Sequence, residues 1–75
     1  MKIFKSPSDF DLFAVLTELE AVLYCEAFRT KTPVIIPELD DKVFNVQEIN
    51  PYKDNDAPKN AWRLVVSPEP GRRRW

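Results

Sequence analysis

The sequence predicts an α+β fold, with one long N-terminal helix packed on a small antiparallel sheet of about three strands. Three observations support this prediction. Residues 8–29 contain no proline or glycine. The segments 42–49 and 61–67 are rich in β-branched and aromatic residues. The roughly ten residues between those segments are rich in Pro, Asn and Asp, a length that can return the chain antiparallel.

The length and composition indicate one small globular domain. A chain of 75 residues buries only about 60% of the surface that its unfolded form exposes, so we expect marginal stability. Hydrophobic residues make up 44% and charged residues 31% of the chain, a balance typical of a folded protein. We assign residues 1–67 to the domain and residues 68–75 to a flexible basic tail.

The predicted helix has start and stop signals at its two ends. Ser6 can cap it, Pro7 suits the first helical position, and the pair Ser8 and Asp11 repeats the capping pattern. The helix is expected to continue to about Arg29 and to stop before Pro33.

Two further segments read as strands in addition to residues 42–49 and 61–67. Residues 33–37 form a short run bracketed by prolines, which is typical of an edge strand or an extended connector, and residues 2–4 could add a short strand. Within residues 61–67, strict alternation predicts that one side faces the core; its members are Trp62, Leu64 and Val66.

The predicted helix is apolar nearly all round. One side is expected to cover the sheet: Leu12, Leu16, Leu19 and Leu23, flanked by Val15, Val22 and Ala27. The opposite side is small or aromatic where charges are usual, so we predict a protein contact surface there, for self-association or for a partner. With two aromatic residues from the later segments, the partner-binding set is Ala14, Ala21, Tyr24, Cys25, Phe28, Tyr52 and Trp62. The alternative is that the alanines merely favour helix and that Tyr24 and Phe28 cover a neighbouring loop.

The side-chain inventory argues against catalysis. The chain has no histidine and a single cysteine, Cys25, so the commonest general base, the usual zinc spacings and an intrachain disulfide are absent from the sequence. The carboxylates of residues 38–41 and 54–56 lie in turn-like segments and read as solvated surface. The single glycine, Gly71, excludes the usual phosphate-binding loops. We therefore expect no enzyme activity, cofactor, metal or small-molecule substrate.

Basic residues gather at the C-terminal end of a chain whose net charge is −1. The set Arg63, Arg72, Arg73, Arg74 and Trp75 could contact nucleic acid or an acidic partner, with the arginines pairing and the indole stacking. A sequence pI near 5.3 argues against a dedicated nucleic-acid surface. An inert, solvated tail is the third interpretation.

These observations favour a small non-catalytic protein that binds and modulates a larger protein. Short chains without catalytic residues are often inhibitors or accessory proteins, including those of phages and mobile elements. The alternative is a nucleic-acid-associated protein that uses the arginine and tryptophan tail. With no apolar run of about 18 residues and no signal peptide in the sequence, we expect a cytoplasmic protein without membrane contact.

Overall fold

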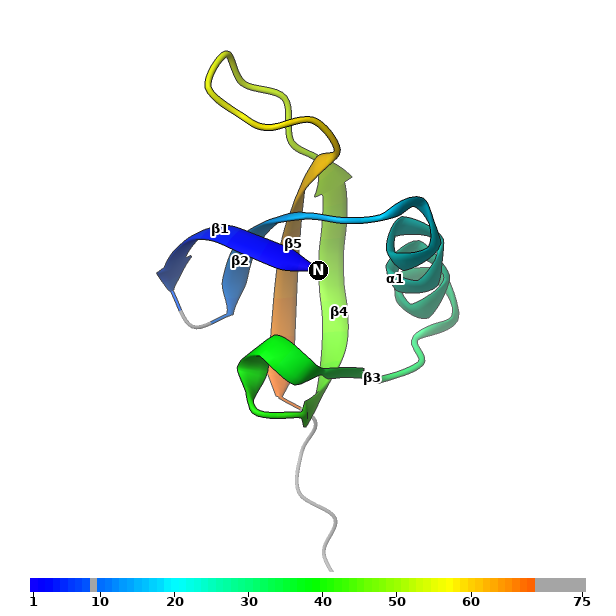
Figure 1. Ribbon diagram of the computed structural model, residues 1–75. Coiled ribbons are helices and arrows are strands. Elements are labelled where there is room, and N and C mark those ends of the chain that lie inside the picture. The colour runs from blue at the N-terminus through cyan, green and yellow to red at the C-terminus, as the bar shows by residue number, and fades with distance from the viewer. Residues whose placement is uncertain (9, 69–75) are drawn as a thin grey trace, which may run out of the picture.

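The computed structural model describes residues 1–8 and 10–68 and confirms the α+β class (Figure 1). Within the described residues the sheet has five strands, all antiparallel, and not about three. In chain order the elements are β1 (Lys2–Ser8), β2 (Asp11–Val15), α1 (Glu18–Thr30), β3 (Val34–Ile36), a 3-10 turn η1 (Pro37–Leu39), β4 (Lys42–Pro51) and β5 (Ala61–Pro68). The predicted strands at 33–37, 42–49 and 61–67 are therefore confirmed.

The strand order across the sheet is β1-β2-β5-β4-β3, which places β5 at the centre. Leu12 of β2 pairs with Leu64 of β5, and Val46 of β4 pairs with Val66 of β5. All four side chains are buried on the same side of the sheet, as alternation along a strand requires. The predicted inward side of β5 is thus confirmed at Leu64 and Val66.

The prediction of one helix from about residue 6 to Arg29 is wrong over its first half. Residues 2–8 and 11–15 form the hairpin of β1 and β2, and the helix begins only after Thr17. β2 pairs along its whole length with β5, and Leu12 and Ala14 are fully buried by that pairing. Tertiary pairing therefore overrides a local pattern that is also compatible with helix.

The sheet is strongly curled, so that its two edges approach each other near α1. Figure 1 shows β1 running across the direction of β4 and β5, while α1 lies beside β4. The α-amino group of Met1, just before β1, pairs with Glu20 of α1 and lies 3.5 Å from the Glu38 carboxylate of η1. β-bulges in β1 and in β4 add to the twist that produces this curl. α1 closes the opening that remains.

The core lies between the curled sheet and α1. Its fully buried large side chains are Leu12, Leu16, Ile36, Leu64 and Val66. From α1 only Tyr24 and Ala27 are buried. The predicted sheet-facing stripe is therefore wrong for the helix: Leu19, Val22 and Leu23 are exposed, whereas Leu12 and Leu16 enter the core from β2 and the segment that follows it.

No helix in the described part of the chain is long and apolar enough to cross a membrane.

Candidate functional site

The orientation of α1 is fixed at its first turn by a capping box. The Thr17 hydroxyl accepts a hydrogen bond from the Glu20 backbone N–H at 3.1 Å, and the Glu20 carboxylate accepts one from the Thr17 N–H at 2.9 Å. These two bonds satisfy donors that a helix start otherwise leaves free. Glu20 also pairs with the Met1 amine. These contacts hold α1 in an orientation in which the side that carries Glu20, Tyr24 and Ala27 faces the sheet.

The side of α1 that faces away from the sheet carries three large aliphatic side chains in the open. Leu19 is 83% exposed, Val22 62% and Leu23 55%. Their spacing of three and four residues places them together on one helix surface. We call Leu19, Val22 and Leu23 the α1 patch. A small domain gains stability by burying such residues, so their joint exposure points to contact with another molecule.

A shallow groove runs along one side of α1, apolar at one end and mixed in polarity at the other. Its first hollow, about 300 Å³, is lined by Ala21, Val22, Cys25, Glu26, Arg29 and Trp62. A second hollow of about 340 Å³ shares Ala21 and Trp62 and continues to Leu16, Thr17, Glu18 and Asn60. We call these two hollows together the α1 groove. Val22 belongs to both the groove and the α1 patch, so the two form one continuous surface.

Charges border this surface on the helix side. Arg29 forms an ion pair with Glu26, three residues earlier on the same helix. On the side of α1 that faces the sheet, the ion pair with Met1 lowers the pKa of the Glu20 carboxyl below its usual value of 4.5, and the same pair raises the pKa of the Met1 amine above 8.0. No ion pair involves Glu18 within residues 1–8 and 10–68.

The structure brings three of the predicted partner-binding residues together. Ala21, Cys25 and Trp62 line the first hollow, although Trp62 comes from β5 and the other two come from α1. Phe28 is exposed on the same helix and lines a neighbouring hollow of about 330 Å³, formed with Lys31 and residues 45–47 of β4.

Two members of that predicted set do not lie on an exposed helix surface. Ala14 is in β2, paired with Trp62 and fully buried. Tyr24 is on α1 but turns toward the sheet and is 4% exposed. Burial and the nearby Glu38 and Glu20 carboxylates raise the pKa of its phenol. Both residues are therefore core positions, because the helix starts later and faces the other way than the sequence pattern indicates.

Tyr52 and Arg63 lie away from the α1 groove, in a cluster on the other side of the sheet. The Tyr52 ring packs edge-on against Phe13 with centroids 4.7 Å apart, and Phe4 lies within 6.5 Å of both rings. The hydroxyl of Tyr52 donates to Asp54 at 3.0 Å, and this bond raises the pKa of the phenol. The cluster covers part of the second side of the sheet, on which Ile35 and Val43 stay exposed.

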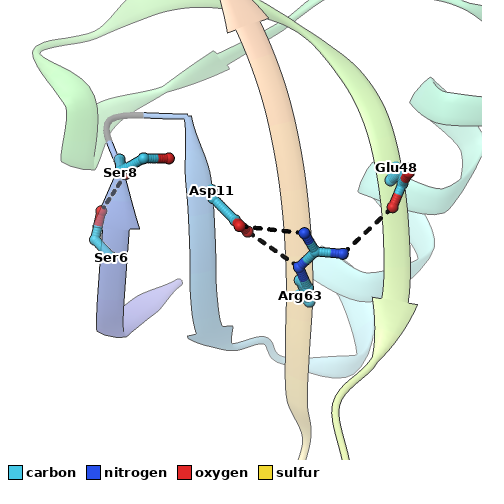
Figure 2. Close-up of polar contacts among 5 residues, drawn as sticks. All are labelled: Ser6, Ser8, Asp11, Glu48 and Arg63. Carbon is cyan, nitrogen blue, oxygen red and sulfur yellow. Dashed lines mark hydrogen bonds and ion pairs between the residues drawn. The ribbon is translucent and has the colours of Figure 1, made fainter.

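Arg63 is held by carboxylates from two neighbouring strands, as Figure 2 shows. Its Nε and Nη2 atoms each donate to Asp11 at 3.1 Å, and Nη1 reaches Glu48 at 3.4 Å. The hydrogen bonds to Asp11 raise the pKa of the guanidinium. A two-pronged contact of this kind uses the donors that a phosphate would need. Arg63 therefore ties β2, β5 and β4 together.

The remaining predicted residues, Arg72, Arg73, Arg74 and Trp75, lie outside the described residues, as does the tail after Pro68. Sequence reasoning missed the α1 patch as a contact surface. The signal that could have found it is the pair Thr17 and Glu20, which fits a capping box and places the helix start nine or more residues later than Ser6 or Ser8 does.

Comparison with protein-family models, with curated protein sequences and with solved structures finds no match for this chain.

Proposed function

We propose that this chain is a small non-catalytic protein that binds a larger protein through the outward side of α1 and modulates it. The joint exposure of Leu19, Val22 and Leu23 carries this proposal. Exposed apolar residues gathered in one patch mark a contact site, because burying them on association releases water from apolar surface.

The surroundings of the α1 patch support a protein as the bound molecule. The hollows beside it are open and shallow, and the first is lined mainly by apolar atoms around Trp62. Small-molecule sites instead enclose most of their ligand. Within the described residues, no group of three or more His, Cys, Asp or Glu side chains is arranged to hold a metal ion.

The nucleic-acid alternative has less support in the described part of the chain. Arg63, on which it relied, directs its donors at Asp11 and Glu48, and Trp62 lies against α1 in an apolar hollow. Neither residue presents the free cation beside an open aromatic ring that single-stranded nucleic acid requires.

The test compares two charge insertions at equally exposed apolar residues. Leu23→Glu places a carboxylate in the α1 patch, and Ile35→Glu places one on β3, where Ile35 is 58% exposed against 55% for Leu23. Tagged wild-type and variant chains are used as bait at moderate salt, with and without nuclease, and bound proteins are quantified by mass spectrometry. We expect Leu23→Glu to lose at least tenfold of a stoichiometric partner and Ile35→Glu to retain it.

Circular dichroism of both variants checks that they remain folded, as substitutions at exposed positions should. Equal partner recovery by Leu23→Glu and wild type would contradict the proposal. So would a bound fraction that disappears on nuclease treatment.

A further inference from the structure

The chemistry of the α1 groove points to one kind of partner segment. Trp62 lines both hollows, and two of the α1 residues that line the first hollow with it are small, namely Ala21 and Cys25. Because Ala21 and Cys25 are small, a side chain of another molecule can reach the partly buried indole. An aliphatic or aromatic side chain placed there would exchange water for contact with the indole, which is a common anchor in protein contacts.

The length of the groove suits a short helix lying beside α1. The lining residues on α1 and at its cap extend from Thr17 to Arg29. Twelve residues at a rise of about 1.5 Å each give about 18 Å, which is the length of about three helical turns. Small side chains at positions 21 and 25, one turn apart, allow a second helix to approach closely.

The alternative of adding a strand to the sheet is less favourable because both edges are protected. β3 has three residues and lies between Pro33 and Pro37. β1, at the other edge, contains Pro7 and two lysines and is interrupted by bulges. Short length, prolines, lysines and bulges are the features by which sheet edges resist pairing with another chain.

The charges along the groove complement a basic partner. Glu26 is paired with Arg29, but Glu18, which lines the end near Trp62 and Asn60, has no ionic partner within the described residues. The helix dipole favours a carboxylate in the first turn, so Glu18 suits its position even without an ionic partner. A lysine or arginine of the partner could pair with this carboxylate, which lies next to the apolar first hollow.

We propose that the α1 groove binds a basic amphipathic helix of the partner protein. One apolar side chain of that helix packs on Trp62, and a lysine or arginine pairs with Glu18. This inference rests on the proposed function and adds the partner's chemistry to it.

The test uses two designed 14-residue helical peptides, one built from leucine and lysine and the other from leucine and glutamate in the same pattern. The full-length chain carries Trp75→Phe, which leaves Trp62 as its only tryptophan. Two signals are recorded during titration: the emission of Trp62, and the rate at which the only thiol, Cys25, reacts with a disulfide reagent. Both residues line the first hollow, so an occupant there must affect both.

We expect the leucine–lysine peptide to shift the Trp62 emission to shorter wavelength and to slow Cys25 modification at least fivefold, while the leucine–glutamate peptide does neither. Glu18→Lys should weaken binding of the basic peptide about threefold or more, the effect of losing one exposed ion pair and adding repulsion. Asp56→Lys is the matched control, since it makes the same change in charge on the segment between β4 and β5. Ala21→Arg, which fills the groove, should abolish the Cys25 protection.

Two results would overturn the inference: equal effects of both peptides, or binding of the basic peptide that leaves Cys25 reactivity unchanged. In either case the proposed function still stands if Leu23→Glu removes the partner. Loss of the proposed function is recognised separately, by partner recovery that does not respond to Leu23→Glu.

Discussion

At the scale of single residues, the structure reverses the two sides of the helix that the sequence pattern suggests. Leu16 and Leu19 are three residues apart and would share one buried stripe on a continuous helix. In the structure Leu16 precedes the helix and is 1% exposed, whereas Leu19 is 83% exposed. The two substitutions to alanine should therefore have very different costs.

We expect Leu16→Ala to lower the free energy of unfolding by about 2–5 kcal/mol, the usual range for a fully buried leucine. Leu19→Ala should change it by no more than about 0.5 kcal/mol, as at an exposed position. Urea denaturation followed by circular dichroism measures both. Similar losses for the two variants would mean that Leu19 also faces the core.

At the scale of elements, the start of α1 is the feature on which the other differences depend. Three candidate caps compete in the sequence: Ser6, the pair Ser8 and Asp11, and the pair Thr17 and Glu20. The last forms a complete capping box. We expect Thr17→Ala to destabilise the protein by about 1 kcal/mol, whereas Ser8→Ala should be nearly neutral because Ser8 lies in β1 and caps no helix. Urea titrations of the two variants side by side decide this, and a larger cost at Ser8 would place the helix start where the sequence pattern put it.

The sequence is informative about β3, β4 and β5 because their patterns all indicate extended backbone and none fits a helix. Prolines bracket residues 34–36, and strict alternation marks residues 61–67. Residues 11–16 are ambiguous: Leu12, Ala14 and Leu16 alternate as in a strand, yet Leu12 and Leu16 are also four apart as in a helix. Only pairing with β5 resolves this, and that contact joins residues about fifty positions apart. The candidate site depends on the same pairing. Ala21, Cys25 and Trp62 could be chosen from their residue types alone. The exposure of Leu19 and Leu23, in contrast, follows from where the helix begins.

At the scale of the whole molecule, a cluster of charges lies where the start of the chain meets α1 and η1. The Met1 amine joins the first strand to Glu20 of α1 and lies near Glu38 of η1. These elements are far apart in sequence, and the contact brings the β1 edge of the sheet to the helix that covers its opening. Stability should therefore depend on the protonation of this cluster at both ends of the pH scale.

The direction of each pKa shift determines how the free energy of unfolding changes at low pH and at high pH. The pKa of Glu20 is lowered, so its contribution is present above pH 4.5 and is lost as the pH falls through the lower folded-state pKa. The pKa of the amine is raised, so its contribution is complete below pH 8.0 and is lost as the pH rises through the higher folded-state pKa. Stability that comes from this pair should thus be greatest between these two limits.

Glu20→Gln should remove the acid flank of this dependence and weaken the alkaline flank, because the Glu38 carboxylate still raises the pKa of the amine. Acetylation of the Met1 amine should remove the alkaline flank and the contact with Glu20. Glu26→Gln is the matched control, because Glu26 pairs with Arg29 on the open side of α1, away from the closure. Urea denaturation between pH 3 and 10 measures all three proteins against the unmodified chain. A profile for Glu20→Gln with the same slopes as the wild type would show that other groups govern the pH response. A flattened profile, with Glu26→Gln unchanged, would assign the closure of the sheet to the contact between the first residue and the helix.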